Sequence, residues 1–185
     1  MLDKPFYSVV IVELGMGDGR LLESLAKRDS NSLYVGIEID KEQCSQAQSR
    51  ITLVNVAIMS GSFEDIVPTF PDESVDSFIA VLPDPAFIDE KKQNRWKPFY
   101  KIVHSKLKSG GNLRLVTEVT DELLQPVSEE AYKKWVTWLK GCFLSIGFVL
   151  TNQLEGAPAQ YSTRCLDQFS GDPDRIRIAT LELTK

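Results

Sequence analysis

The sequence predicts an α/β fold organised around an open, mostly parallel β-sheet. Apolar, β-branched runs of strand length alternate with segments of helical periodicity, and a glycine-rich turn joins the first run to the first helix. The longest apolar runs are far shorter than the roughly 18 residues that a membrane span needs. A chain of 185 residues suits one well-buried domain, and we expect residues 1–185 to form it.

The amino-terminal half shows this alternation most clearly. Tyr7–Leu14 is a buried-strand pattern, followed by glycines and a helical pattern over Leu21–Arg28. Leu33–Ile39 is the next strand candidate, and Asp40 is a suitable N-cap for the helix-forming residues that follow it. Val54–Met59 and Val75–Leu82 are expected to be the third and fourth strands.

The carboxyl-terminal half continues with longer helices. Pro98–Leu107 has helical spacing, and we expect the pair Gly110 and Gly111 to cap it before a strand over Asn112–Glu118. Residues 129–148 have the pattern of an amphipathic helix, which places its tryptophans in the core rather than at a cofactor. Two last strands are expected at Phe148–Gln153 and Arg175–Leu183.

Composition and charge exclude several classes of protein. The chain has one histidine, three cysteines without a C-x-x-C pair, and neither a G-x-S-x-G nor a P-loop string, so we expect no metal site, no such hydrolase and no P-loop ATPase. The net charge is −5, but Lys91–Lys108 contains seven Lys or Arg residues and no acid. Residues 1–15 lack a secretory-signal pattern, so we expect a cytoplasmic protein without membrane attachment.

The first turn is the strongest indication of a ligand site. Its sequence, Glu13-Leu14-Gly15-Met16-Gly17-Asp18-Gly19, has glycine at every second position. A dinucleotide site would need another glycine at position 20, which is Arg20, so NAD and FAD are disfavoured. The three glycines still let a ligand without a pyrophosphate lie against the backbone, and Glu13 is suited to hold its ammonium group.

Two later corners complete the predicted ligand site. Glu38 ends the second strand, 19 residues after Gly19, close to the spacing of about 20 expected for an acid that binds ribose hydroxyls. Its two acceptor oxygens suit a diol, and we expect the neighbouring Ile39 to line the same site. Ser62 and Phe63, at the third corner, would offer a polar group and an apolar edge to adenine.

Together, the E-x-G-x-G-x-G turn, the acid that ends the second strand and the loop after the fourth strand resemble the class I S-adenosylmethionine-dependent methyltransferases. This resemblance implies a Rossmann-like, seven-stranded sheet with an antiparallel last strand. It also implies S-adenosyl-L-methionine as cofactor, bound by Glu13, Gly15, Gly17, Gly19, Glu38, Ile39, Ser62, Phe63 and Pro83.

The segment from Leu82 to Glu118 resembles tRNA (guanine-N7-)-methyltransferases, in which a P-D-P loop precedes a basic segment and a helix. Tyr161-Ser162-Thr163-Arg164 is similar to the T-K-F-E segment of that family, with enough differences to indicate a divergent member. Guanine N7 already carries a free lone pair, so methyl transfer needs chiefly alignment and exclusion of water. We expect Asp84 to anchor the base by accepting hydrogen bonds from N1–H and the exocyclic amino group.

Other residues are expected to hold the RNA. Lys91, Lys92 and Arg95 suit phosphates, with an aromatic residue of the same segment stacking on a splayed base. The alternative is a solvated basic face over buried aromatic residues, and Asp84 has an alternative role as a turn acid that satisfies local backbone donors. The resemblance adds Thr117, Glu118, Thr163 and Arg164 to the substrate site.

Three other functions remain open from the sequence. LGMGDGR and YVGIEID also resemble the 16S rRNA adenine-N1 methyltransferases, which need aromatic stacking near the fourth strand. The acidic isoelectric point, near 5.0, favours a small-molecule methyltransferase instead. A non-catalytic partner subunit that retains the fold is the third.

Overall fold

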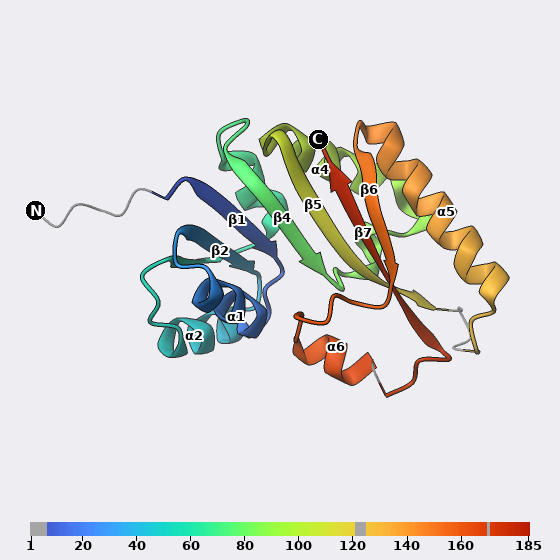
Figure 1. Cartoon of the computed structure of the whole chain (residues 1–185), viewed down its shortest axis with the longest axis horizontal. Coiled ribbons are helices and arrows are strands. Elements are labelled where there is room, and N and C mark those ends of the chain that lie inside the picture. Colours follow the sequence, from blue (N-terminus) through green and yellow to red (C-terminus); the bar gives the residue numbers. More distant parts are fainter. Residues whose placement is uncertain (1–6, 121–124, 170) are drawn as a thin grey trace, which may run out of the picture.

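One seven-stranded sheet organises the computed structural model, which describes residues 7–120, 125–169 and 171–185 (Figure 1). The strand order is β3-β2-β1-β4-β5-β7-β6. Strands β1 to β5 pair in parallel, whereas β7 is antiparallel to both of its neighbours, β5 and β6. The predicted seven-stranded α/β fold is therefore confirmed. The strands are β1 Val9–Leu14, β2 Ser32–Glu38, β3 Val56–Ser60, β4 Val75–Val81, β5 Leu107–Thr120, β6 Val149–Glu155 and β7 Ile176–Thr184.

Helices cover both faces of the sheet because neighbouring residues of its central strands point to opposite sides. In β1, Val12 and Leu14 belong to the core formed with α4 (Gln93–Lys106) and α5 (Glu129–Ile146). Ile11 instead packs toward α1 (Arg20–Arg28) and α2 (Lys41–Arg50). The short elements are α3 Phe63–Ile66, α6 Arg164–Phe169, and the 3-10 turns Val67–Thr69, Pro85–Phe87 and Glu90–Lys92.

The connection between α4 and β5 differs from the sequence-based expectation. Helix α4 begins at Gln93, five residues before Pro98, and ends at Lys106, so the glycine pair does not cap it. Leu107, which is fully buried, already pairs with Val75 at the start of β5. The glycines form an irregularity within β5 instead, with Gly110 at φ +76°, a left-handed conformation that glycine adopts without strain.

Helix α5 packs its apolar side on the sheet, as its periodicity indicates. Tyr132, Val136 and Phe143 are buried, while Trp135 and Trp138 are only partly buried against the same core. Among the helices of the described residues, none has both the length and the apolar character that a bilayer crossing requires.

The carboxyl ends of β1, β2, β4 and β5 share one edge of the sheet, the lower edge in Figure 1, because these strands are parallel. In open α/β sheets this edge is where ligands bind. Helix α6 lies in front of this edge, although it comes from the far end of the sequence (Figure 1). The fold thus gathers the glycine turn, the P-D-P loop and the Thr163–Arg164 segment near one edge.

Candidate functional site

The glycine turn folds back over the end of the second strand. The backbone N–H groups of Gly15 and Met16 both donate to the carbonyl of Ile37, at 2.9 and 3.0 Å. Gly15 has φ +72°, and a Cβ added there would enter open space. The loop therefore leaves bare backbone exposed, as the sequence indicated, and the positive φ favours glycine at this position although there is room for a side chain.

Glu13 is the buried carboxyl group of this loop. Only 2% of the residue is exposed, and its Oε2 atom has no hydrogen-bond partner among the described residues. Burial, with a smaller contribution from the nearby negative charge of Asp18, raises the pKa of Glu13 to about 8. An unpaired carboxyl group in such a place is a binding position for a cation, since a cation would supply the missing partner.

Glu38 serves the loop itself. Its Oε2 accepts from the Gly17 N–H at 2.8 Å, and its Oε1 accepts from the Asp40 N–H at 2.9 Å. The side chain is buried, and each oxygen keeps a second lone pair for a hydroxyl donor. Glu38 thus fixes the glycine turn while remaining able to accept hydrogen bonds from a ligand.

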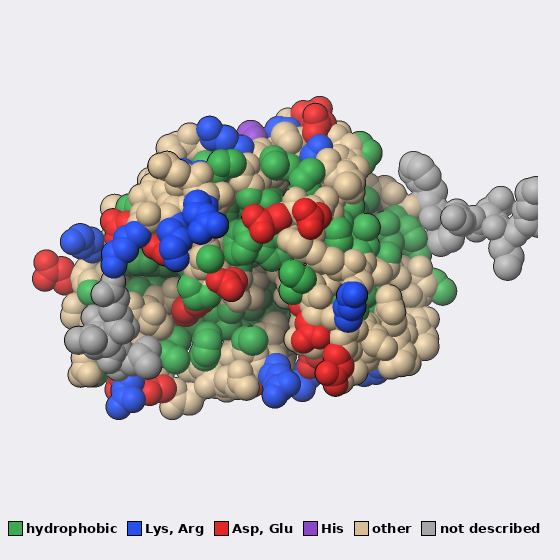
Figure 2. Space-filling model, turned by 180° about the vertical axis from the view of Figure 1, so that it is seen from behind, with side chains coloured by type: hydrophobic (Ala, Val, Ile, Leu, Met, Phe, Trp, Pro, Cys, Tyr) green, Lys and Arg blue, Asp and Glu red, His purple; other side chains and the backbone are tan. Residues whose placement is uncertain are grey.

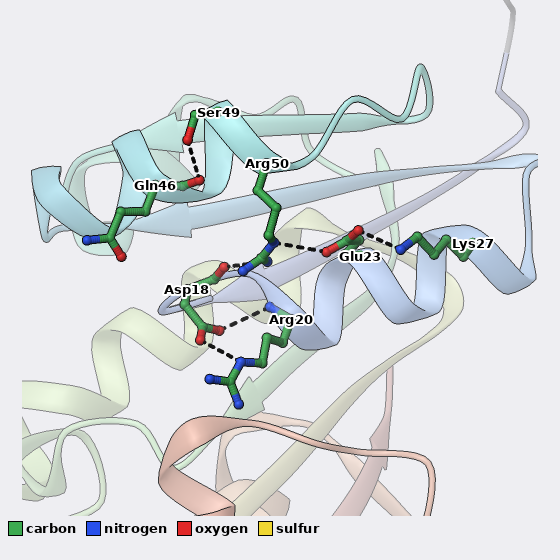
Figure 3. A network of polar contacts seen from close by, with 7 residues as sticks. All are labelled: Asp18, Arg20, Glu23, Lys27, Gln46, Ser49 and Arg50. Carbon is green, nitrogen blue, oxygen red and sulfur yellow. Dashed lines mark hydrogen bonds and ion pairs between the residues drawn. The ribbon is translucent and has the colours of Figure 1, made fainter.

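A polar network supports the turn from outside (Figure 3). Asp18 accepts from the Arg20 backbone and pairs with its guanidinium at 2.8 Å. Arg50, which ends α2, donates to the Asp18 carbonyl at 2.8 Å and pairs with Glu23 of α1 at 3.1 Å. Each exposed ion pair contributes little by itself, but the network links the loop to both helices. Its remaining contacts are Lys27 with Glu23 and, on α2, Ser49 with the Gln46 carbonyl.

These elements enclose a cavity of about 300 Å³, which we call the glycine-loop pocket. The first turn forms one wall, with Gln43 of α2 and Val81 of β4. Residues before and within α6 form another wall, so Thr163 and Arg164 lie here rather than beside Asp84. The complete lining is Glu13, Gly15, Met16, Gly17, Asp18, Gln43, Val81, Thr163, Arg164, Cys165 and Gln168.

The predicted adenine corner is partly assembled. Ile39 is 70% exposed, an unusual position for a large apolar side chain and one that a planar apolar group would cover. Ser62 caps α3 by accepting from the Glu64 N–H, and Phe63 packs against Phe87 and Phe99. Gly19 differs from the other two glycines of the turn, because it is buried against Ile51 and Ala47 and does not line the pocket.

A second cavity, of about 530 Å³, lies around the P-D-P loop, and we call it the Asp84 pocket. It brings Asp84 together with Glu118 of β5 and with Lys91 and Lys92 of the basic segment. The full lining is Asp84, Pro85, Ala86, Ile88, Asp89, Glu90, Lys91, Lys92, Glu118, Thr120 and Trp135. In the view of Figure 2, acidic and apolar side chains surround a hollow near the centre of the face, with Lys and Arg side chains gathered to its upper left.

Asp84 has a structural role in its loop. Its Oδ1 accepts from the Ala86 N–H at 2.8 Å and so caps the 3-10 turn Pro85–Phe87. This is the local role considered as an alternative, and it occupies one of the two oxygens. Leu82, two residues earlier, has φ +51°, a strained conformation for a branched side chain, and such strain clusters at functional sites.

Glu118 is the second carboxyl group of the Asp84 pocket. Its Oε2 is buried without a hydrogen-bond partner in the described residues. Burial raises the pKa of Glu118, and the neighbouring Asp84 charge adds to the shift. The pair therefore combines an exposed carboxyl group with a partly buried one whose pKa is raised above its ordinary value.

Other predicted substrate residues have different surroundings. Thr117 is fully buried, with its hydroxyl donating to the Glu118 carbonyl, so it does not line either pocket. Arg95 lines a smaller cavity, of about 200 Å³, with Glu64, Ala86, Phe87, Lys92 and Trp96. Pro83, two residues after the end of β4, was predicted to bind the cofactor, but it is buried and lines neither pocket.

The aromatic residues of the basic segment are buried in the core and not exposed for stacking. Trp96, Phe99 and Tyr100 are at most 5% exposed and pack in the core. The expectation of a stacking aromatic within this segment is wrong, because helical periodicity turns these side chains toward the sheet and the basic ones outward. In the sequence, only this periodicity distinguishes buried aromatic side chains from exposed ones that could stack on a base.

Several residues that line the two pockets were not predicted, among them Gln43, Cys165 and Trp135. Gln43 follows the N-cap of α2 by one turn, and Cys165 follows Arg164, so both are brought to the glycine-loop pocket by neighbours that the sequence did indicate. Trp135 was assigned to the core, yet it lines the Asp84 pocket. Its position on the apolar side of α5 indicated burial in the core and did not indicate that it would line a cavity.

The glycine-loop pocket fits the cofactor that the sequence resemblance implies. S-adenosylmethionine carries an ammonium group, for which the unpaired Oε2 of Glu13 is a suitable acceptor. The open space in front of Gly15 suits a ligand in close contact with the backbone. Glu38 is bonded to Gly17 but does not itself line the pocket, and it retains acceptor capacity for ribose hydroxyls.

Comparisons with known proteins agree with this geometry. A family model described as a methyltransferase matches residues 7–138, well over half of the chain. The chain is 28% identical over 172 residues to the tRNA (guanine-N(7)-)-methyltransferase of Campylobacter fetus, covering 91% of this chain and 38% of that protein. The corresponding Magnetococcus marinus enzyme is 27% identical over 119 residues, covering 59% of this chain and 46% of that protein. The chain thus spans less than half of the length of these relatives.

Solved structures share the fold. An S-adenosylmethionine-dependent methyltransferase from Mesorhizobium loti superposes with a TM-score of 0.65 at 15% identity, over 100% of this chain and 94% of that one. The 16S rRNA methyltransferase KamB gives a TM-score of 0.73 at 16% identity, over 98% of this chain and 89% of that one. At such identities the similarity establishes the fold alone.

Proposed function

Because this chain belongs to a family of S-adenosylmethionine-dependent methyltransferases, we propose that it transfers the methyl group to N7 of a guanine in tRNA. The observation that carries this proposal is the Asp84 pocket, which pairs a carboxylate with a second carboxyl group and two lysines. A cytoplasmic location, expected from the sequence, is consistent with this substrate. The proposal treats residues 1–185 as one methyltransferase domain.

The roles follow from the chemistry of the base. Asp84 Oδ1 is engaged by Ala86, so Oδ2 is the acceptor for guanine N1–H or the exocyclic amino group. Glu118, whose buried Oε2 has no partner in the described residues, is placed as a second hydrogen-bonding group for the polar edge of the base. N7 needs no deprotonation, so the two carboxyl groups orient the base rather than act as bases.

The cofactor supplies an electrophilic methyl group, and the protein residues hold the cofactor in place. We assign its ammonium group to Glu13, its ribose to Glu38 and its adenine to the surface formed by Ile39, Ser62 and Phe63. Gly15 and Gly17 provide the backbone surface, and Thr163 and Arg164 close the pocket from the side of α6.

The direct test is methyl incorporation from labelled S-adenosylmethionine into unmodified total tRNA, with rRNA in parallel, followed by nucleoside analysis. We expect 7-methylguanosine in tRNA. Label confined to rRNA would contradict the proposal. A protein that binds the cofactor but labels neither RNA would be a methyltransferase for a different substrate or an incomplete enzyme.

Replacing Glu38 with alanine is expected to weaken binding of S-adenosylhomocysteine by about 1–3 kcal/mol, because hydrogen bonds to the ribose are lost. The change also frees the Gly17 and Asp40 N–H groups, so part of the loss is a loosened turn. Calorimetry with a deoxyribose analogue separates the two effects. If Glu38 binds the ribose, the wild type discriminates between the two ligands and the Glu38→Ala variant does not. Equal discrimination by both proteins would reject the assignment.

Binding of tRNA is expected to weaken steeply with salt. If Lys91, Lys92 and Arg95 contact three phosphates, log Kd should rise with log salt with a slope of about 2–3. Replacing all three by glutamine should abolish most of this slope, as measured by filter binding between 50 and 200 mM salt. The matched control replaces Lys27 and Arg28, at the far end of α1, by glutamine and should keep the slope. Equal slopes in the two variants would remove the basic segment from the RNA-binding surface.

A further inference from the structure

The Asp84 pocket contains one aromatic side chain without an assigned role, Trp135. It lies on α5 and lines the pocket with Asp84 and Glu118, although its neighbours on the same helix face belong to the core. Trp135 is only partly buried, whereas Val136 and Leu139 on α5 are fully covered. Its indole ring thus belongs in part to the core and in part to the cavity.

The other two tryptophans have complete structural roles. Trp96 is 1% exposed, and its indole N–H donates to the Asp89 carbonyl at 2.8 Å. Trp138 packs edge-on against Trp96, with ring centroids 6.3 Å apart. In the described part of the chain, the one ring that neighbours Trp135 is that of Trp138, tilted by 53° at 6.1 Å.

The lining of the pocket matches the parts of a purine nucleotide. Carboxyl groups recognise the polar edge of a base, lysines suit its phosphate, and an indole covers its flat face. A volume of about 530 Å³ lies within the usual range of small-ligand sites. A base that enters such a pocket has left its RNA stack, and a protein aromatic face replaces part of the stacking that is lost.

We propose that Trp135 stacks on the face of the target guanine after the base has left the RNA stack, and holds its plane while Asp84 and Glu118 bind its edge. This inference rests on the proposed function. It adds Trp135 as a residue that determines the specificity for the base. Trp135 sets the plane in which N7 is presented, so its loss affects binding of the base more than folding of the chain.

Replacing Trp135 with leucine, which retains apolar bulk, is expected to raise the KM for tRNA about tenfold, because one stacked base is lost. Trp135→Phe should restore most of the affinity, since phenylalanine also stacks. Trp138→Leu is the matched control: it should lower the melting temperature through the contact with Trp96 and leave the KM unchanged. A Trp135→Leu enzyme with the wild-type KM would overturn the inference.

Fluorescence gives a readout that does not depend on turnover. The chain has three tryptophans, so a Trp96→Phe, Trp138→Phe variant reports on Trp135 alone. Stacking predicts quenching on titration with unmodified tRNA in the presence of S-adenosylhomocysteine. The quenching should be lost with a transcript that lacks only the base at the methylated position. Quenching that persists with this transcript would show that Trp135 does not contact the target base.

The same experiments separate this inference from the proposed function. Methyl transfer to tRNA without quenching leaves the function intact and removes Trp135 from it. If tRNA is not methylated at all, the proposed function fails. Quenching by guanosine monophosphate would then retain Trp135 as a purine-binding residue, and its absence would reject both proposals.

Discussion

Replacing Glu13 with glutamine is expected to weaken cofactor binding and, at the same time, to stabilise the cofactor-free protein above neutral pH. Glutamine has nearly the same shape but no charge to offer an ammonium group. The loss of a charge-assisted hydrogen bond corresponds to about 1.5–3 kcal/mol, or roughly 10- to 150-fold in the dissociation constant. Calorimetry with S-adenosylhomocysteine measures this directly.

The stability effect depends on pH in a defined direction. The ordinary pKa of a glutamate is 4.5, and burial raises that of Glu13 to about 8, so the unfolded chain releases this proton at lower pH than the folded one. The free energy of unfolding of the wild type therefore falls as pH rises from about 4.5 to 8. Glu13→Gln lacks this loss, so the two proteins should melt alike near pH 4.5. The variant should be more stable at pH 8, by at most roughly 5 kcal/mol.

Proton release distinguishes this account from a purely structural role. If Glu13 is neutral in the cofactor-free protein and pairs with the ammonium group when ionised, binding near pH 7 releases a proton. The observed binding enthalpy then depends on the ionisation enthalpy of the buffer, and this dependence should disappear in Glu13→Gln. The control Glu130→Gln changes the same charge on the exposed surface of α5 and should behave as the wild type. A Glu13→Gln protein with wild-type affinity would remove Glu13 from the cofactor site.

Asp84→Asn is the second change with a large expected effect. Asparagine retains an oxygen that caps the turn through the Ala86 N–H, but it presents an amino group where Asp84 presents Oδ2. A donor there faces the N1–H and amino donors of guanine, so turnover on tRNA should fall by about 100-fold or more, because a charge-assisted hydrogen bond is lost and two donors face each other in its place. Binding of S-adenosylhomocysteine should stay within about twofold, because a different pocket holds the cofactor.

Comparison of Asp84→Asn with Asp84→Ala shows whether the carboxylate acts by capping its own turn or by binding the base. Alanine removes both the cap and the acceptor, so it should be at least as inactive and also less stable. Asp72→Asn, which changes an exposed acid that precedes β4 and pairs with Lys106, controls for charge. If Asp84→Asn turns over at the wild-type rate while Asp84→Ala is inactive, Asp84 acts only through its loop and the anchor role is wrong.

Local patterns in the sequence were sufficient to predict the fold and the glycine turn with its acidic partner Glu38. Strand and helix periodicities predicted all seven strands within a few residues, except at β5, which begins at Leu107 rather than at Asn112. The glycine spacing and the distance from Gly19 to Glu38 indicated a turn and an acid that the structure brings within 2.8 Å of each other. These features lie in consecutive βα units, whose geometry is set by short-range connections.

The Asp84 pocket, in contrast, was decided by tertiary structure. Its residues come from a loop after β4, from the end of β5 and from α5, so their approach depends on how these elements pack. The same holds for Thr163 and Arg164, which lie at the start of α6 and line the glycine-loop pocket, and for Trp135, whose apolar helix face predicted only burial. Periodicity identifies the apolar face of a helix. Only the packing of the helix against its neighbours determines which residues of that face are buried and which line a cavity.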